Sequence, residues 1–208
     1  MVRRTKEDAE STRNHLLDAA EAVFNDKGVA RTSLANIATA AGVTRGAIYW
    51  HFKNKADLFH AMLERVKMPM DEMIGQLSVE QLANPLAFLR SGALSVLDRV
   101  ATDSQTRRVF DIVIHKCEFV DEMAVARERH LESRAGCLEQ IEQGVQAAIK
   151  QNLLPQSVDP HSAAIGLHAL IDGLISNWVL HPDSFSLGDE AAKLVDIYLT
   201  GLRNHFPQ

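Results

Sequence analysis

Apolar residues recur at the spacing of α-helices along most of the chain. Within residues 8–27, for example, Leu16, Ala20 and Phe24 follow one another at intervals of four, which places them on one face of a helix. Glycine, proline and short polar clusters interrupt this pattern, and such residues end helices. The pattern predicts helices over residues 8–27, 34–41, 45–51, 55–77, 85–102, 104–115, 121–152, 159–181 and 188–204.

The sequence shows neither the apolar/polar alternation nor the Val/Ile/Thr-rich runs between turn signals that β-strands need. It therefore predicts an all-α fold of about nine helices. The first helices are short and the later ones long, and the composition shifts near residue 55. We predict a three-helix headpiece over residues 1–54 and a larger helical body over residues 55–208.

Three polar residues mark the starts of the second, third and fourth predicted helices. Ser33, Thr44 and Asn54 each precede a helical pattern, and side chains of these types accept bonds from the free amides of a first helical turn. Asp57, three residues after Asn54, is in the position of a capping box. The second predicted helix ends at Gly42, within eight residues of its start.

The bulk composition indicates a globular protein and excludes few functions. The chain has 208 residues, of which 46% are hydrophobic and 24% charged, values ordinary for a globular domain. Charges interrupt the apolar runs before the roughly 18–20 residues of a membrane span, so we expect no membrane contact. Two cysteines are too few for a disulfide framework, and we expect reduced thiols in the cytoplasm.

The net charge of -5 hides a basic block near the N-terminus. Residues 27–55 include Lys27, Arg31, Arg45, Lys53 and Lys55 but no acidic residue. Such a block in an acidic protein is typical of a surface that binds a polyanion. Charge alone leaves open whether it is only a solvated surface.

Residues 33–52 have the layout of a helix-turn-helix motif. Two short predicted helices flank the turn A-G-V-T at residues 41–44, with Gly42 where the chain must reverse. In this motif the second helix enters the DNA major groove by its N-terminal end.

The helix predicted over residues 45–51 has two distinct faces. At about 100° per residue, one face carries Arg45, Gly46, Tyr49 and Trp50. Ile48 and Phe52 lie opposite, where they and Val43 can pack on Leu34, Ile37 and Ala38. We therefore expect the first face to be exposed, although Tyr49 and Trp50 could instead cover apolar surface inside the protein.

The exposed face suits DNA chemically. Arginine binds a guanine edge or a phosphate, and a glycine lets the backbone approach closely. Tyrosine and tryptophan can donate hydrogen bonds to phosphates while their rings pack on sugars or thymine methyl groups. The sequence thus predicts double-stranded DNA as a partner.

A longer pattern covers the same region. The string T-x-x-x-I-A-x-x-A-G-V-T-R-G-A-I-Y-W-H-F-x-N-K-x-x-L-F, from Thr32 to Phe59, resembles the signature of the TetR family of transcriptional regulators. The stretches T-R-R at 106–108, H-K-C-E-F at 115–119 and D-G-L-I at 172–175 are similar to its AcrR/TtgR-like branch, which represses multidrug efflux pumps. The resemblance is dense over residues 1–60 and patchy afterwards.

The resemblance implies DNA-contacting residues. It implies that Thr44, Tyr49, His51 and Lys55 hold phosphates and that Arg45, Gly46 and Trp50 meet bases or sugars. Thr32 and Ser33, at the start of the second helix, would also touch the DNA backbone. His51 alone falls to one side of the predicted exposed face.

The last two predicted helices suit self-association, because apolar residues occupy more than one stripe on the first of them. One stripe could face the core and the other a second copy of the chain, or both could form a thick internal core. The resemblance implies an intersubunit four-helix bundle. The predicted interface residues are Leu167, Leu170, Leu174, Trp178, Leu194, Ile197, Tyr198 and Leu202.

The resemblance also implies a cavity for a small apolar or aromatic effector. Candidate lining residues, which could equally be ordinary core, are Met62, Val66, Met73, Leu89, Val96, Phe110, Val113, Ile114, Ile141, His168, Ile171, Asp172 and Ile175. Phe110 and Ile114 stand where the multidrug branch has polar residues, which indicates a more apolar cavity. Asp172 needs a partner in its apolar helix, and it could orient a ligand or stabilise a local network.

Other chemistries have weaker signals. His115, Cys117 and Glu118 could begin a metal site, but residues two apart on a helix do not face each other. No catalytic or nucleotide-binding motif occurs in the chain. We therefore predict a ligand-responsive repressor without a cofactor or enzymatic activity. A redox- or metal-sensing regulator that uses Cys117 and Cys137, and a helical ligand-binding protein or enzyme with a vestigial headpiece, remain as alternatives.

Overall fold

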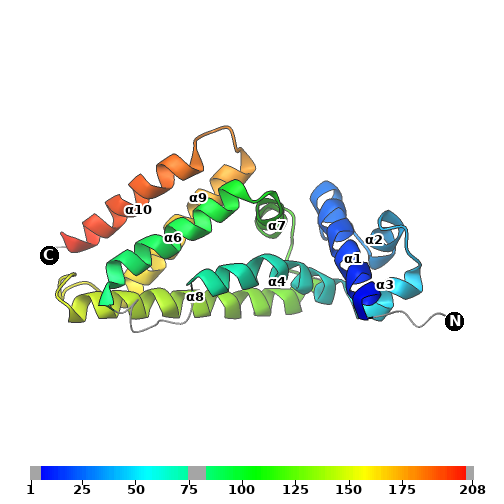
Figure 1. Ribbon diagram of the computed structural model, residues 1–208, viewed down its shortest axis with the longest axis horizontal. Coiled ribbons are helices and arrows are strands. Elements are labelled where there is room, and N and C mark those ends of the chain that lie inside the picture. The colour runs from blue at the N-terminus through cyan, green and yellow to red at the C-terminus, as the bar shows by residue number, and fades with distance from the viewer. Residues whose placement is uncertain (1–5, 75–82, 205–208) are drawn as a thin grey trace. The chain divides into compact units, whose positions relative to one another are not determined.

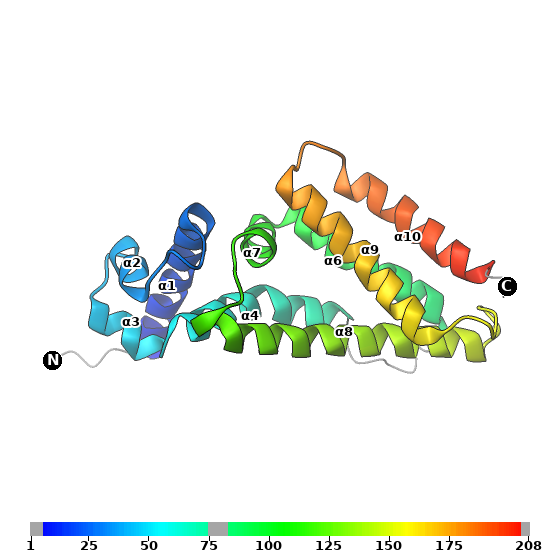
Figure 2. The ribbon, with the colours of Figure 1, turned by 180° about the vertical axis from the view of Figure 1, so that it is seen from behind.

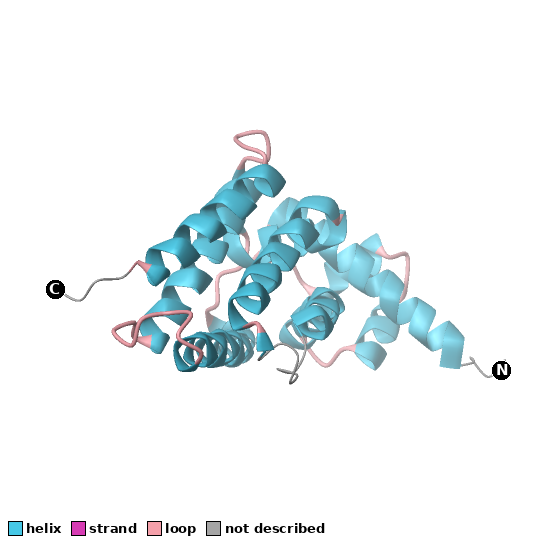
Figure 3. Cartoon of the chain, turned by 60° about the vertical axis from the view of Figure 1, so that its left-hand side comes forward, coloured by secondary structure: helices cyan, strands magenta, loops and turns pink. Residues whose placement is uncertain are grey.

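All regular structure over the described residues is helical (Figure 3). The computed structural model describes residues 6–74 and 83–204, with the side chains of residues 67–74 excepted. The predicted all-α class is therefore confirmed. The helices are α1 (Lys6–Lys27), α2 (Leu34–Ala40), α3 (Arg45–His51), α4 (Lys55–Ile74), α6 (Pro85–Thr102), α7 (Ser104–His115), the 3₁₀ helix η1 (Asp121–Met123), α8 (Ala124–Lys150), α9 (Pro160–Leu180) and α10 (Leu187–Arg203).

The helix boundaries follow the predicted ones closely. The main difference is at the start of α8, where residues 121–123 form a separate 3₁₀ turn instead of the first turn of the predicted helix. Asp121 there has a φ of 50°, a left-handed conformation that an α-helix cannot include. The predicted end of the fourth helix, residues 75–77, lies outside the described residues.

The chain forms two compact units. The first, which we call the N-terminal unit, comprises residues 1–67 and 108–129, and the second, the C-terminal unit, comprises residues 68–107 and 130–208. Helices α4, α7 and α8 each contribute residues to both units. The functional boundary predicted between residues 54 and 55 is a separate matter and stays a prediction.

The core of the N-terminal unit contains side chains of α1, α2, α3 and α4, together with residues of α7, η1 and the start of α8. Figure 1 shows α1, α2 and α3 side by side. Phe24 and Phe59 meet edge to face at 6.1 Å between ring centroids. Ile48 and Phe52 are at most 1% exposed and belong to the same cluster as Leu34, Ile37 and Ala38. The predicted packing of α3 on α2 is confirmed, and it leaves the opposite face of α3 outside the core.

Side-chain caps begin α2, α3 and α4 as predicted. The hydroxyl of Ser33 accepts from the Asn36 amide at 3.2 Å, and the hydroxyl of Thr44 accepts from the Ala47 amide at 3.2 Å. Asn54 accepts from the Asp57 amide at 2.8 Å. The Asp57 carboxylate reaches back to the amide of Lys53 at 3.0 Å, one residue earlier than in the predicted capping box.

A buried lysine closes the loop between α1 and α2. The Lys55 ammonium is 5% exposed and donates to the carbonyl oxygens of Val29 and Thr32, both at 2.9 Å. The hydroxyl of Thr32 donates to the Gly28 carbonyl at 2.8 Å, and Gly28 has a φ of +79°. Buried carbonyl groups need such donors, so Lys55 and Thr32 shape the entry into α2.

The C-terminal unit packs α6, α9 and α10 side by side (Figures 1 and 2). Each helix buries one apolar stripe, for example Leu187, Ala191, Val195 and Leu199 on α10. On the surface the Arg90 guanidinium donates twice to the Asp196 carboxylate, at 2.6 and 3.0 Å. This pairing lowers the pKa of Asp196 and joins α6 to α10.

Helix α9 corrects one expectation about membranes. Over the described residues, Pro160–Leu180 is long and apolar enough to cross a membrane by length and composition, although the sequence analysis expected charges to interrupt every such run. The helix instead packs on α6 and α10, and Asp172 lies near its middle with an ionic partner. Core helices of globular proteins share this composition.

Replacement of Lys55 tests its internal role. Lys55→Met keeps most of the side-chain volume but removes the donor to the Thr32 carbonyl. An unsatisfied buried carbonyl costs about 1–3 kcal/mol, so we expect the free energy of unfolding, measured in urea, to fall by that amount. Lys53→Met, at an exposed lysine two residues earlier, should change it by less than about 0.5 kcal/mol. Equal stabilities for both variants would contradict the internal role.

Candidate DNA-binding interface and effector site

Helix α3 presents the predicted face to solvent within the N-terminal unit. Tyr49 is 47% exposed and Trp50 is 72% exposed, and Arg45 and Gly46 are also exposed. Ile48, on the opposite side, is fully buried. The alternative that Tyr49 and Trp50 cover apolar surface inside this unit is therefore wrong.

Contacts within α3 hold this face in place. The Arg45 guanidinium carbon lies 5.7 Å from the centroid of the Tyr49 ring, close enough for a cation–π attraction. The Trp50 ring meets the His51 ring edge to face at 4.5 Å. These contacts limit the motion of the side chains without burying them. A ligand that binds here therefore loses less free energy to the ordering of these side chains.

Gly46 has no packing role in the unit. Apart from its chain neighbours and the backbone of its own helix, the one atom of the described residues within 4 Å of a Cβ built on it is the Thr44 hydroxyl oxygen, at 4.0 Å. Larger residues would fit in the free protein, and they would favour the helix more than glycine does. A glycine at this position makes physical sense where another molecule approaches the backbone closely.

Thr44 and Ser33, the two helix caps predicted to contact DNA, differ in whether their hydroxyl protons remain available for a hydrogen bond. The Thr44 hydroxyl accepts the capping bond, and a hydroxyl that accepts keeps its own proton for another acceptor. The Ser33 hydroxyl donates to the Asn36 side chain at 2.7 Å, so its proton is in use. Thr44 is therefore the better placed of the two to hold a phosphate.

Two predicted DNA contacts need correction. Lys55 and Thr32, expected at phosphates, are 5% and 3% exposed, and their polar groups bond the α1–α2 loop. Lys55 is also 2.7 Å from a carboxylate oxygen of Glu122. Lys55 donates to two carbonyl oxygens of the loop and Thr32 donates to a third, so neither residue is kept as a DNA contact.

Arg13 is a candidate that the sequence analysis missed. Its guanidinium carbon lies 5.3 Å from the centroid of the Phe52 ring, directly after α3. The exposed Lys53 follows in the chain. Nothing in the local sequence links Arg13 in α1 to α3, because only tertiary packing brings them together.

The predicted effector-lining residues are divided between the two units. Met62 and Val66 belong to the buried core of the N-terminal unit, where Phe110 and Val113 are half-buried and Ile114 is 38% exposed. Met73 lies outside the residues with described side chains. The C-terminal unit contains the others, of which Leu89 and Ile175 are buried, Val96, Ile141, His168 and Ile171 half-buried, and Asp172 exposed.

Asp172 finds its partner one turn earlier on its own helix. A carboxylate oxygen of Asp172 lies 3.0 Å from Nδ1 of His168. The His168 side chain is 15% exposed and that of Asp172 is 58% exposed. Burial lowers the pKa of the neighbouring His130, and the Asp172 charge opposes that shift. The pair is the local network foreseen for Asp172, and its contact with a ligand stays a prediction.

Two predicted dimer residues lie inside the C-terminal unit. Leu167 is 2% exposed and Trp178 is 7% exposed. The Trp178 indole donates to the Phe185 carbonyl at 3.1 Å, and the Arg107 guanidinium carbon lies 4.9 Å from its ring centroid. The indole N–H of Trp178 thus finds its acceptor inside the unit. Because both side chains are buried, Leu167 and Trp178 belong to the core stripe of α9.

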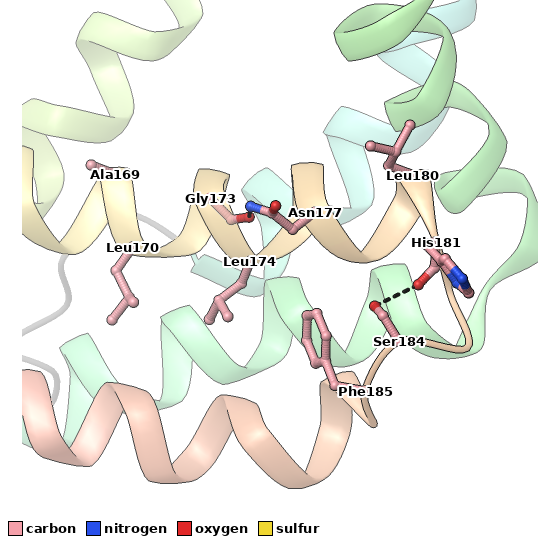
Figure 4. A pocket seen from close by; sticks show the side chains of 9 residues that line it. All are labelled: Ala169, Leu170, Gly173, Leu174, Asn177, Leu180, His181, Ser184 and Phe185. Atoms are coloured by element: carbon pink, nitrogen blue, oxygen red, sulfur yellow. Dashed lines mark hydrogen bonds between the residues drawn. The ribbon is translucent and has the colours of Figure 1, made fainter.

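The other stripe of α9 lines an open groove (Figure 4). The groove has a volume of about 590 Å³ and includes Leu170, Leu174, Leu180 and Phe185. Leu180 is 70% exposed, and Ile197 on α10 is 66% exposed. Leu194, Tyr198 and Leu202 are half-buried, and the Tyr198 hydroxyl donates to the Ala163 carbonyl at 2.8 Å.

The Cys117 thiol gives the redox alternative little support. Burial raises the pKa of the Cys117 thiol to about 11, although the nearby Lys55 ammonium opposes the shift. A protonated thiol is a poor nucleophile and oxidises slowly. Over the described residues, no group of three or more His, Cys, Asp or Glu side chains is arranged to hold a metal ion.

Alkylation measures the state of Cys117. In a Cys137→Ser variant, iodoacetamide at pH 8 should modify the native protein about 100-fold more slowly than the urea-unfolded protein, because a rise of two pKa units reduces the thiolate population by that factor. Mass spectrometry of timed samples would give both rates. Similar rates would show an accessible, reactive thiol and restore the redox alternative.

Family models match most of the chain. The model for bacterial regulatory proteins of the tetR family matches residues 16–62, which include α2 and α3. The model for the C-terminal region of MAATS-type transcriptional repressors matches residues 84–204. Together they cover the candidate DNA-binding face and the described part of the C-terminal unit from α6 onward.

Individual relatives agree with these matches. The chain is 42% identical over 203 residues to the HTH-type transcriptional regulator TtgR of Pseudomonas putida, a match that covers 98% of this chain and 97% of the relative. Among solved structures, NalD, the secondary repressor of the MexAB-OprM multidrug efflux pump in Pseudomonas aeruginosa, aligns with a TM-score of 0.87 at 39% identity and covers 97% of this chain and 100% of its own. The SmeT–triclosan complex aligns with a TM-score of 0.81 at 30% identity over 95% and 98% of the two chains. The helix-turn-helix, the exposed face of α3 and these full-length matches show that the chain belongs to the TetR family of bacterial transcriptional regulators.

Proposed function

We propose that this protein represses a multidrug efflux or transporter operon, binds a palindromic operator as a homodimer and leaves it when a small apolar or aromatic molecule binds. The observation that carries the proposal is the exposed, pre-ordered face of α3 on a buried anchor, Ile48 and Phe52. The relatives support it, since NalD is described as a repressor of a multidrug efflux pump. We assign DNA binding to residues 1–54, effector binding and dimerisation to residues 55–208, and a cytoplasmic location to the protein.

Each residue of the face has a distinct role in the proposal. Arg45 would read a guanine edge or clamp a phosphate, and Gly46 would let the backbone of α3 approach the groove. Tyr49 and Thr44 would donate to phosphates, while Trp50 would pack its ring on sugars or a thymine methyl group. Ser33 and the half-buried His51 would contact the DNA backbone at the edges of this surface.

A dimer follows from the size of the headpiece and the apolar groove on α9. One short recognition helix covers only part of an operator, and paired half-sites read by a two-fold dimer solve this problem. Leu180 of the groove and Ile197 on α10 are large apolar side chains that lie mostly exposed, and Leu170 and Leu174 of the groove are half-buried. Large apolar side chains left exposed in one unit support a protein–protein contact.

The effector proposal rests on the relatives more than on the described side chains. SmeT has been solved with triclosan, a small apolar aromatic compound. Within the C-terminal unit, the half-buried candidates Ile141 and Ile171 would suit such a ligand, and the His168–Asp172 pair could accept a hydrogen bond from its polar group or donate one to it. A coupling of about 1–3 kcal/mol between effector and DNA would change operator affinity roughly 5- to 150-fold.

Operator binding with and without triclosan tests the proposal directly. The DNA upstream of the protein's own gene would be titrated with the full chain, and we expect selective binding that triclosan weakens. Binding that is equally strong on unrelated DNA at all salt concentrations would overturn the repressor proposal. Selective binding that triclosan leaves unchanged would contradict the proposed effector class, while the proposed operator binding would stand.

Replacements on α3 test the roles on the face. Arg45→Ala should lower operator affinity by roughly 5- to 150-fold and relax base preference at one position. Tyr49→Phe, which removes one hydroxyl, should lower affinity by a smaller factor that is equal for all sequences. Both side chains are exposed, so the free energy of unfolding should change by less than about 0.5 kcal/mol.

Binding-site selection from a randomised operator would compare the two variants with Lys150→Met, a control at an exposed lysine at the end of α8. An Arg45→Ala variant with wild-type base preference but a reduced salt dependence would make Arg45 a phosphate contact only.

A further inference from the structure

The chain links its two units through three helices. Residues of α4, α7 and α8 belong partly to each unit. The segment between α7 and α8, residues 116–123, lies wholly within the N-terminal unit, and we call it the α7–α8 connection. A change in the C-terminal unit therefore reaches the N-terminal unit through α4 and through the two helices that flank this connection.

Lys116 ties the α7–α8 connection to the end of α1. Its ammonium donates to the backbone oxygen of Asn25 at 2.8 Å and to the side-chain oxygen of Asn25 at 2.7 Å. The same group lies 2.9 Å from a carboxylate oxygen of Asp111 in α7. In addition, the Lys116 carbonyl accepts from the amide of Val29 at 2.9 Å.

Lys55 ties the same connection to the same loop from α4. Its ammonium bonds the carbonyl oxygens of Val29 and Thr32 and pairs with Glu122 at 2.7 Å. Val29 is thus held through its amide by the connection and through its carbonyl by α4. Two buried or half-buried lysines join three segments that are distant in sequence: the α1–α2 loop, the start of α4 and the α7–α8 connection.

The α1–α2 loop sets the direction of the helices that follow it. Thr32 is followed at once by Ser33, the N-cap of α2. The turn to α3 is short and hydrogen-bonded, with the Val43 amide donating to the Ala38 carbonyl at 3.0 Å. A shift of the loop consequently moves α2 and α3 together.

A second link joins α7 to α1 in this unit. Glu21 of α1 is 2% exposed and lies 3.2 Å from the Arg65 guanidinium of α4 and 3.8 Å from that of Arg108 in α7. Phe119 of the connection meets Phe59 edge to face at 6.2 Å. The connection is therefore packed into the core of the N-terminal unit and moves with it.

We propose that the α7–α8 connection is a second route, beside α4, by which a change in the C-terminal unit repositions α3, with Lys116 and Lys55 as the positioning residues that join it to the α1–α2 loop. The proposal rests on the function proposed above. It can be distinguished from a route through α4 alone. A substitution of Lys116 removes its hydrogen bonds to Asn25 and leaves every side chain of α4 unchanged.

Hydrogen exchange of the free protein tests the link without DNA or effector. Lys116→Met removes the bonds to Asn25 and Asp111 and keeps the length of the side chain. We expect amide exchange to accelerate together in residues 25–33 and 116–123, by roughly 3- to 30-fold, and to stay unchanged in α6 and α10. Acceleration in only one of the two segments, or in neither, overturns the link.

Operator release then tests the route itself. The ratio of operator Kd with and without triclosan would be measured for wild type, Lys116→Met, Lys116→Arg and the exposed-lysine control Lys150→Met. We expect Lys116→Met to reduce this ratio by roughly 3- to 30-fold, with operator affinity in the absence of triclosan within about threefold of wild type. Lys116→Arg, which can still donate to Asn25, should restore most of the ratio.

The outcomes separate the inference from the proposed function. A wild-type ratio in Lys116→Met overturns the route, whereas the proposed function stands. A wild-type protein that triclosan does not release contradicts the proposed effector class. The exchange experiment then still tests whether Lys116 joins the two segments, and its failure overturns the inference. A variant that has merely lost stability would show a lower Tm with an unchanged ratio, which also counts against the route.

Discussion

The ammonium of Lys55 is the interaction on which the placement of the DNA-binding face depends. It lies almost fully buried and bonds the carbonyl oxygens of Val29 and Thr32. A buried charge is costly unless it is fully bonded, and here two carbonyls and the Glu122 carboxylate supply its partners. The two bonds to carbonyl oxygens hold the loop that leads into α2, so the cost of burying the lysine and the geometry of the helix-turn-helix are linked.

Helix α3 can devote most of its surface to another molecule because it is anchored elsewhere. A seven-residue helix is unstable alone, and such helices owe their stability to tertiary packing. Ile48 and Phe52 supply that packing, and Thr44 satisfies an amide at the start. The exposed side chains of Tyr49 and Trp50 lie outside the core of the unit and can serve recognition.

Helix α9, like α3, packs one face in the core of its unit and leaves another face open. One stripe, with Leu167 and Trp178, completes the core of the C-terminal unit, and the other, with Leu170 and Leu174, lines an open groove. A helix that is apolar on both sides is buried on both sides in a finished assembly, which is why the groove supports the proposed dimer. The apolar character that gives α9 the composition of a membrane helix has the same origin.

The sequence by itself determined the helices, the helix-turn-helix and the exposed face of α3. These depend on periodicity, capping and glycine placement, which act over one or two turns of the chain, and the resemblance to the TetR family rests on that same stretch. The sequence indicated that Asp172 needs a partner, and the structure identified it as His168, four residues earlier on the same helix. Only the tertiary structure decided which polar and aromatic side chains serve the interior. Lys55 donates to carbonyl oxygens of the α1–α2 loop, which lies 23 or more residues earlier in the chain. Thr32 belongs to that loop and donates to the Gly28 carbonyl within it.

Trp178 was assigned to the wrong stripe of α9 because both stripes are apolar. The partners that fix the side on which its ring lies, Arg107 and Phe185, are on other elements. Long-range partners of this kind leave no periodic trace in the chain, so the fold has to be known before they can be found.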